Sequence, residues 1–385
     1  MTRRNLRTIV FLVLTTFIAT TSLTVPSSLA EKIPGQANRI GNLWELHQKN
    51  SPCISRNELA PSALQPPRPT NSKLPIPVGI SLHVNEIPEI SDTRNQFILD
   101  GLLTTTWCDA RATTEQTNAN DYQVLYGGAA EDWLNNHWFP QVEFANKVGE
   151  SFYQTQSITL HSNGSIEYAR RLQENLGSDF SLNKFPFDNQ SLLIQLQSFS
   201  WPRTVVKLIS LGDVVSLGKS TRLPEWTIRG LNYQLNDHDD PEKGSLEYSR
   251  LEARINVSRK YGYYLYKIFI PLALLGFTSI FFLAIPIHEI ADRLGFISGL
   301  LFTTLAYQLV ITSNVPRVPY FTLGDTYTIV LFGFMIAEVL IAYIIHRSVS
   351  KSKVKGIPTI ERTMEIILPV TFGIFQIAFI TYALI

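Results

Sequence analysis

The order of apolar and polar residues divides the chain into two unlike halves. Between residues 77 and 260, short apolar runs are bounded by turn residues, and residues 78–84 alternate with period two, as a half-buried strand does. Similar runs predict further strands at 97–107, 151–160, 191–199, 204–209, 226–235 and 246–257. Asn163-Gly164 predicts a hairpin between two of these short segments. Many short strands without a long amphipathic helix predict an all-β, immunoglobulin-like antiparallel sandwich.

After residue 261 the apolar runs become long and almost free of charge. They lie at 268–287, 294–316, 326–345 and 366–385, and a single acid, Glu338, interrupts the third run. A helix needs about 20 residues to cross a hydrocarbon core of about 30 Å. The pattern therefore predicts an all-α domain at 261–385 with four transmembrane spans, at 263–285, 293–313, 326–346 and 364–385. Glu338 is either a functional acid or a protonated one that is bonded within the bundle.

The N-terminal segment has the three-part pattern of a secretory signal peptide, which we place at residues 1–30. Arg3, Arg4 and Arg7 precede a short apolar stretch, and Ser28-Leu29-Ala30 is a small-residue cleavage site. An uncleaved first membrane helix is the alternative. Residues 31–76 form an N-terminal extension rich in Pro, Asn and Ser, either a disordered lead-in or a cap on the sandwich at 77–260.

The charge pattern predicts the topology and excludes one class of partner. Five Lys and Arg residues lie between the third and fourth spans, which places that segment in the cytoplasm. An exported sandwich and an even number of spans then leave both the N-terminal domain and the C-terminus outside, in a multi-pass protein of the cell (inner) membrane. With 33 basic and 32 acidic residues, the chain gives no electrostatic reason to bind nucleic acid.

The two cysteines and the other chemical motifs are few. Cys53 and Cys108 either form one disulfide or remain two thiols, and the spacing does not decide between them. Residues 288–292 approach a zinc-protease motif, but Asp292 stands where that motif has its second His. The sequence therefore predicts no enzyme, no metal and no cofactor.

The second membrane run is unusually polar. It contains six hydroxyl or amide side chains, namely Ser298, Thr303, Thr304, Gln308, Thr312 and Ser313. Part of this helix should face water or other helices rather than lipid. Ordinary bonding between helices is the alternative. One helix cannot enclose a pore, so a channel would require a ring of copies.

Several motifs resemble one known family. The segment Asn183-Lys184-Phe185-Pro186-Phe187-Asp188-Asn189-Gln190 resembles the signature loop of the pentameric ligand-gated ion channels, the Cys-loop receptor superfamily. Cysteines flank this loop in animal members, whereas Ser178 and Leu192 stand there in this chain, as in the cysteine-free prokaryotic branch. Further matches, in order along the chain, are Trp138-Phe139-Pro140 with Asn146, residues 195–199, Arg259, Pro271 and residues 314–320.

The resemblance implies a homopentamer whose second span lines the pore. Counted from Arg293, the implied pore-lining positions are Asp292, Gly295, Gly299, Phe302, Ala306 and Leu309. A ring of Asp292 carboxylates would favour permeating cations, unless Asp292 pairs with Arg293 or a Lys. Phe302 and Leu309 would form apolar collars. Relatives often have Ser or Thr where this chain has Gly295 and Gly299, so either the inner pore is unusually open or the register is shifted by one residue.

The resemblance also implies an agonist site and a coupling contact. A small amine held by aromatic rings, or protons, would act on the extracellular domain. The implied ligand-binding residues are Phe199, Tyr233, Tyr248, Glu143 and Gln197, and the acidic turn at 236–243 would cap them. The implied coupling residues are Phe187, Asp188, Arg259, Pro316, Arg317, Pro319 and Tyr320, with Asp188 paired to Arg259. A non-conducting, membrane-tethered β-sandwich receptor is the alternative function.

Overall fold

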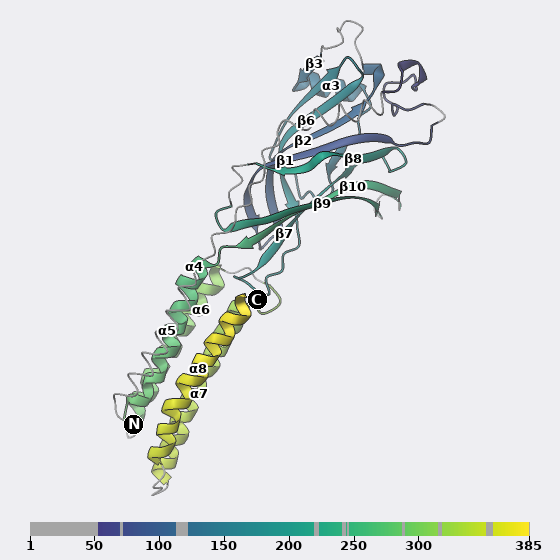
Figure 1. The fold of residues 1–385 in the computed structure, drawn as a ribbon. Helices are drawn as coiled ribbons and strands as arrows, with labels where there is room; N and C mark the ends of the chain where they lie inside the picture. Colours follow the sequence, from purple (N-terminus) through teal and green to yellow (C-terminus); the bar gives the residue numbers. More distant parts are fainter. Residues whose placement is uncertain are drawn as a thin grey trace. The chain divides into compact units, whose positions relative to one another are not determined.

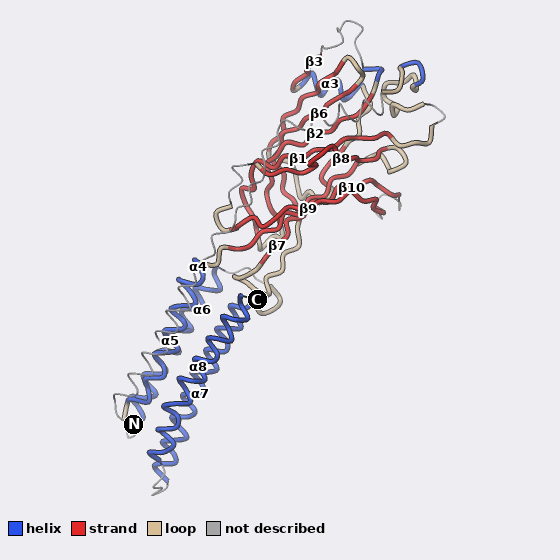
Figure 2. The backbone as a smooth tube through the Cα atoms, in the orientation of Figure 1, coloured by secondary structure: helices blue, strands red, loops and turns tan. Residues whose placement is uncertain are grey.

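The computed structural model describes residues 53–69, 72–112, 122–218, 223–240, 244, 246–286, 289–314, 318–351 and 357–384. The predicted signal peptide and the first part of the N-terminal extension lie outside these residues. The described chain forms two compact units. One is built on strands, and the other contains Ser181–Asp188 together with the chain from Arg259 onward. Figure 2 shows that the long helices all belong to the second unit.

The strand unit consists of two sheets, and its elements are labelled in Figure 1. The six-stranded sheet has the order β3-β5-β6-β2-β1-β8. Its strands are β1(Ile76–Ser91), β2(Gln96–Cys108), β3(Tyr122–Tyr126), β5(Tyr153–His161), β6(Ser165–Gly177) and β8(Val206–Leu217). The four-stranded sheet has the order β4-β7-β10-β9, from β4(Val142–Phe144), β7(Asn189–Ser198), β9(Trp226–Asp240) and β10(Leu246–Arg259).

One apolar core fills the space between the two sheets. β7 contributes Leu192, Ile194 and Leu196, which are fully buried because alternate side chains of a strand point to the same face. β1 departs from the simple alternation that its sequence suggests. Residues 78–82 are all buried, including Ser81 on the second face of the strand. A strand that is covered on both faces has no solvent side for its polar residues.

Most strand pairs are antiparallel, but β1 and β8 are parallel. A parallel pair needs a long connection, and the chain between β1 and β8 provides one. The predicted hairpin is confirmed between β5 and β6, where Leu160 pairs with Ile166. Gly164 has a φ of 83°, and Asn163 Oδ1 accepts a hydrogen bond from the Ser165 N–H at 2.9 Å. The sequence did not predict β3, β4 or the helix α3(Gly128–Asn136).

A disulfide bond fastens the described part of the N-terminal extension to the sandwich. Cys53 is bonded to Cys108, the last residue of β2, at a sequence separation of 55 and with 5.4 Å between their Cα atoms. This finding decides between the two alternatives that the sequence left open. A closed loop of this length stabilises the fold by about 4 kcal/mol in the chain-entropy treatment. Residues 53–69 run as an arm with one short turn, η1(Arg56–Glu58).

The helical unit contains four long helical runs. The first is a continuous run of α4(Gly262–Tyr264), η4(Leu265–Phe269), α5(Ile270–Ser279) and η5(Ile280–Ala284). The other three are α6(Ile290–Asn314), α7(Leu323–Lys351) and α8(Ile357–Leu384). The π-type turn η4 lies just before Pro271, whose ring clashes with the carbonyl four residues earlier in a regular helix.

Three of these runs are long and apolar enough to cross a membrane by length and composition. They are Gly262–Ala284, Leu323–Arg347 and Arg362–Ala383. α6 has 25 residues, which is sufficient length, but it is not among the three. Three of the four predicted spans are thus supported as membrane helices, and the membrane position of α6 remains a prediction.

Candidate functional site

The signature loop Ser181–Asp188 is anchored to the start of α7. The N–H groups of Leu323 and Gly324 donate to the carbonyl oxygens of Asn183 at 2.9 Å and Phe185 at 3.2 Å. The first N–H groups of a helix have no partner within it, so the loop satisfies two of them. The Leu182 N–H also donates to the Tyr320 hydroxyl at 3.1 Å. These contacts explain why the loop belongs to the helical unit.

Aromatic rings extend this anchor into the helices. Phe185 meets Tyr264 edge to face, with 5.0 Å between ring centroids. Phe187 lies between Tyr261 at 5.0 Å and Phe269 at 5.7 Å. Pairs at these separations add stabilisation beyond the burial of their area. The two phenylalanines of the loop are therefore packed against the first helical run.

Asp188 and Arg259 form the predicted ion pair within the helical unit. Arg259 Nε lies 2.7 Å from Asp188 Oδ1, and Nη2 lies 3.1 Å from Oδ2. Both side chains are only 2% exposed. The guanidinium also lies 4.8 Å from the centre of the Phe185 ring. A planar guanidinium held at two points fixes both the distance and the orientation of its partner.

The implied pore-lining residues share one exposed face of α6 on the protomer. Asp292, Gly295, Gly299, Phe302, Ala306 and Leu309 are all exposed. Phe302 and Leu309 are 72% and 71% exposed, which is extreme for large apolar side chains. Arg293, Ile297 and Thr304, on the other side of the helix, are buried. The helix therefore presents this face to something other than its own subunit.

Asp292 and Arg293 point in different directions. Asp292 is exposed, whereas Arg293 is buried, donates from Nε to the Ile285 carbonyl at 2.7 Å and lies 5.9 Å from the Phe282 ring centre. The salt bridge between these neighbours, which the sequence left as an alternative, is not among the contacts of the described residues.

The implied ligand-binding residues fall into two groups. Phe199, just after β7, is 55% exposed, and Tyr233 of β9 is also exposed. Glu143 of β4 is half-buried. Gln197 and Tyr248 are buried. Burial raises the pKa of the Tyr248 phenol, with a further contribution from the charge of Asp240.

Gln197 is engaged inside its own subunit. Its Oε1 accepts hydrogen bonds from Arg250 Nε at 2.9 Å and Nη2 at 2.7 Å, and its Nε2 donates to Asp240 Oδ2 at 3.2 Å. Burial lowers the pKa of Arg250, and the charges of Glu252 and Asp240 oppose this shift. The Gln197 amide thus links β7 to β10 and β9 within the subunit, and its place in the ligand site stays a prediction.

Other predicted residues lie at the margins of the described chain. Pro316 and Arg317 are outside the described residues, whereas Pro319 and Tyr320 are exposed. In the predicted acidic turn, Asp237 pairs with Arg203 at 3.1 Å, and Arg203 pairs with Glu247 at 2.6 Å. The zinc-protease-like segment includes His288, which is also outside the described residues. The described residues contain no group of three His, Cys, Asp or Glu side chains placed to hold a metal.

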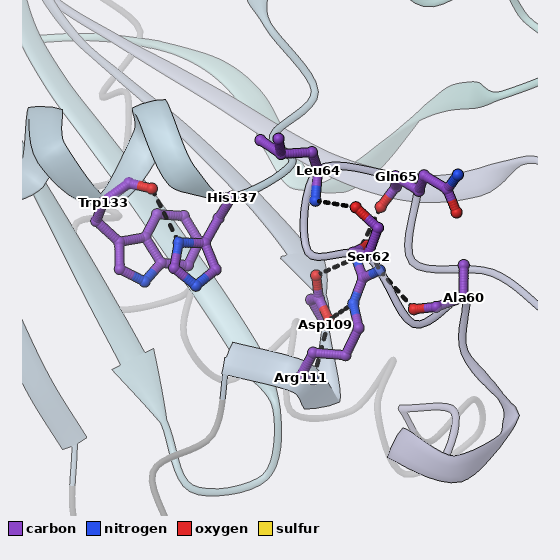
Figure 3. A network of polar contacts seen from close by, with 8 residues as sticks. All are labelled: Ala60, Ser62, Leu64, Gln65, Asp109, Arg111, Trp133 and His137. Atoms are coloured by element: carbon purple, nitrogen blue, oxygen red, sulfur yellow. Dashed lines mark hydrogen bonds and ion pairs between the residues drawn. The ribbon is translucent and has the colours of Figure 1, made fainter.

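Sequence reasoning missed a polar network at the arm, drawn in Figure 3. Asp109 and Arg111 follow the disulfide-bonded Cys108, and both side chains are buried. Arg111 donates from Nε to Asp109 Oδ1 at 2.8 Å and from Nη2 to Oδ2 at 2.7 Å. Figure 3 also shows the stacked rings of Trp133 and His137, whose centroids are 4.2 Å apart. An Asp-x-Arg pattern beside a bonded Cys is the only signal in the sequence, and it is weak.

Comparison with known proteins establishes the class of this protein. The family described as the neurotransmitter-gated ion-channel ligand binding domain matches residues 64–261, which covers the described arm from Leu64 and the whole sandwich. The chain belongs to this family. Its members are ligand-gated ion channels, which are embedded in membranes with the ligand-binding domain outside and are not enzymes, as the sequence predicts.

The matches to individual relatives have low sequence identity but cover most of this chain. The chain is similar to a proton-gated ion channel of Gloeobacter violaceus, with 22% identity over 87% of this chain and 88% of the relative. It is 25% identical to ligand-gated ion channel 50 of Caenorhabditis elegans over 67% of this chain. It is 26% identical to a glutamate-gated chloride channel of Drosophila melanogaster over 69% of this chain. The matches span 52% and 58% of the lengths of the two animal relatives.

Proposed function

We propose that the chain is the subunit of a homopentameric ligand-gated ion channel of the cell membrane, in the branch whose signature loop lacks cysteines. In this proposal residues 1–30 are a signal peptide, the sandwich at 77–260 lies outside the cytoplasm, and the four helical runs of 261–385 all cross the membrane. The single observation that carries the proposal is the exposed face of α6.

The α6 face supports a pore because of the side chains it contains. Its exposed positions combine an acid, two glycines and an alanine with two large apolar residues, spaced by three and four residues. A lipid-facing helix would show apolar side chains at nearly every position and no acid. Five copies of this face around an axis would enclose a water-filled path with Asp292 at its cytoplasmic end.

Phe302 and Leu309 are the proposed gate of the pore. Both side chains extend from the protomer with little contact to it. Rings of five such side chains would form narrow apolar constrictions, which exclude water and therefore ions without a plug. Gly295 and Gly299 have no side chain to narrow the cytoplasmic part of the pore, and a Cβ added at either position would have no atom of the protomer within 4 Å. The exposure of all six positions on the protomer supports the register counted from Arg293.

Cation selectivity is part of the proposal and rests on Asp292. A ring of five carboxylates concentrates cations and repels anions. Arg293 points into the bundle, so its charge does not cancel that of Asp292 at the axis. The chloride channel among the relatives makes anion selectivity the second candidate.

The proposed agonist is a small amine or the proton. Exposed Phe199 and Tyr233 support an amine, since aromatic faces attract ammonium groups. Similarity to a proton-gated channel over most of both chains supports protons. In either case we propose that Phe187, Asp188, Arg259, Pro316, Arg317, Pro319 and Tyr320 transmit the signal to the pore.

Reconstitution of the purified full-length protein in planar bilayers tests the function. A pH step and a panel of primary and quaternary amines should evoke currents that reverse near the cation potential in asymmetric NaCl. Matched vesicles without protein are the control. Reversal near the chloride potential would replace cation by anion selectivity. A folded pentamer that conducts under none of these stimuli would favour the non-conducting receptor.

A further inference from the structure

Besides the disulfide, the side chain of Arg111 holds the arm at residues 53–69. Arg111 donates to the Ala60 carbonyl at 3.0 Å and the Ser62 carbonyl at 2.5 Å through Nη1, and to the Gln65 carbonyl at 2.8 Å through Nη2. Together with its two bonds to Asp109, this uses all five N–H groups of the guanidinium. Figure 3 shows these acceptors converging on Arg111. A Lys side chain could not reproduce this fork.

The clamped arm in turn holds the backbone of Trp138. The Trp138 N–H donates to the Ala63 carbonyl at 2.8 Å, and Ala63 lies between the carbonyls that Arg111 binds. The preceding residue is also fixed, because His137 Nδ1 lies 3.0 Å from the Trp133 carbonyl, which only accepts, so Nδ1 carries the proton. The Trp138 ring is buried and meets Trp107 edge to face at 6.3 Å.

The three residues after Trp138 form hydrogen bonds with the segment that contains Phe199. The Phe139 carbonyl accepts from Trp201 Nε1 at 3.1 Å, and the Pro140 carbonyl accepts from Ser198 Oγ at 2.6 Å. The Gln141 carbonyl accepts from the Phe199 N–H at 2.9 Å. Gln141 has a φ of 49°, which only a few per cent of non-glycine residues adopt. Such a conformation persists only where the surroundings hold it.

We infer that Arg111 is a positioning residue for Phe199, acting through the arm and through residues 138–141. Hydrogen bonds join Arg111 to the arm, the arm to Trp138, and Gln141 to Phe199, and the short backbone segments between these residues complete the path. The inference builds on the proposed function, because Phe199 is the aromatic residue that the proposal assigns to agonist binding. Loss of the guanidinium leaves three carbonyl groups of the arm without their donor and loosens the segment that fixes Phe199.

Hydrogen exchange of the full-length protein tests the inference without any agonist. In Arg111→Met, exchange at the Trp138 and Phe199 amides should rise roughly tenfold or more, while the amides of β2 and β6 stay protected. Arg111→Lys should show the same rise, because one ammonium cannot reach all the acceptors. Arg56→Gln, an exposed Arg of the same arm, is the matched control and should not change exchange at either amide.

Two results would overturn the inference. One is an exchange rate at Trp138 and Phe199 in Arg111→Met that matches the Arg56→Gln control. An equal rise in exchange at β2 and β6 counts the same way, because it indicates that Arg111 only stabilises the whole sandwich. The other is a larger rise at Phe199 in Cys53→Ser/Cys108→Ser than in Arg111→Met, because the disulfide rather than Arg111 would then hold the segment.

Currents separate this inference from the proposed function. If one of the amines opens the reconstituted wild-type channel, Arg111→Met should raise the half-activating concentration of that amine at least tenfold, with unchanged reversal potential and unchanged maximal current. A rise in exchange without that shift supports Arg111 as the positioning residue and instead removes Phe199 from the agonist site.

Discussion

Arg259 and Asp188 face each other with two hydrogen bonds, 2.7 and 3.1 Å long, in a place from which water is almost excluded. The Arg259 N–H also donates to the Asp188 carbonyl at 3.1 Å. The pair joins the end of the signature loop to the last residue of β10, three positions before the first helical run. Because the pair is buried, each charged side chain is stabilised mainly by the opposite charge of the other.

Breaking this pair should destabilise the protein strongly. Arg259→Gln leaves the Asp188 carboxylate buried without its guanidinium, which costs about 3–5 kcal/mol. Thermal unfolding of the detergent-solubilised protein measures the loss. Arg254→Gln, on the same strand, removes an exposed Arg 3.9 Å from Glu252 and should cost at most about 1 kcal/mol. Equal unfolding temperatures for the two variants would contradict the structural role of the pair.

The gate prediction concerns Phe302. Phe302→Ala removes the widest apolar side chain of the exposed α6 face, so the closed pore should admit water and leak ions. The measurement is the current of reconstituted channels without agonist. Leu305→Ala, an exposed residue of the same helix outside the six positions, is the control. A leak from Leu305→Ala but not from Phe302→Ala would indicate a different register.

The selectivity prediction concerns Asp292. Asp292→Asn keeps the size of the side chain but removes five charges from the cytoplasmic mouth, so cation preference should fall and single-channel conductance should decrease. Reversal potentials in asymmetric NaCl measure the change. Glu365→Gln, an acid of α8 elsewhere in the helical unit, serves as the comparison. An unaltered reversal potential for Asp292→Asn would remove this residue from the selectivity ring.

Packing of the helical unit predicts an asymmetry between two glycines. A Cβ at Gly276 would lie 2.3 Å from Phe372 Cζ and 2.7 Å from Leu331 Cδ1, and both of these side chains are fully buried. Gly276→Ala should therefore destabilise the unit by about 1–3 kcal/mol. Gly333→Ala meets nothing within 4 Å and should be neutral or stabilising. Thermal unfolding of both variants in one detergent tests the pair, and a reversed order would refute this packing.

The sequence predicted the long strands well because their apolar runs and turn residues are local signals. All of the predicted runs overlap observed strands. β4 was missed because three residues are too few to display a period, and α3 because its N-cap, Gly127, offers no side-chain cap. β8 continues to Leu217 past its predicted end, where it pairs with β1 across an irregular register.

In the candidate site, too, the sequence predicted only what local motifs encode. The Asp188–Arg259 pair was predicted because both residues stand in recognisable motifs. The engagement of Gln197 was not, because it depends on the register that sets Arg250 opposite Gln197 on the neighbouring strand. No local pattern encodes a partner 53 residues away. The arm clamp by Arg111 was missed for the same reason.

The disulfide also has a practical consequence for experiments. The chain contains only two cysteines, and the Cys53–Cys108 bond uses both. Any cysteine introduced by mutagenesis, for example on the exposed face of α6, would be the sole reactive thiol under non-reducing conditions. The wild-type chain is thus already suited to site-specific spin or fluorophore labelling, without prior removal of native side chains.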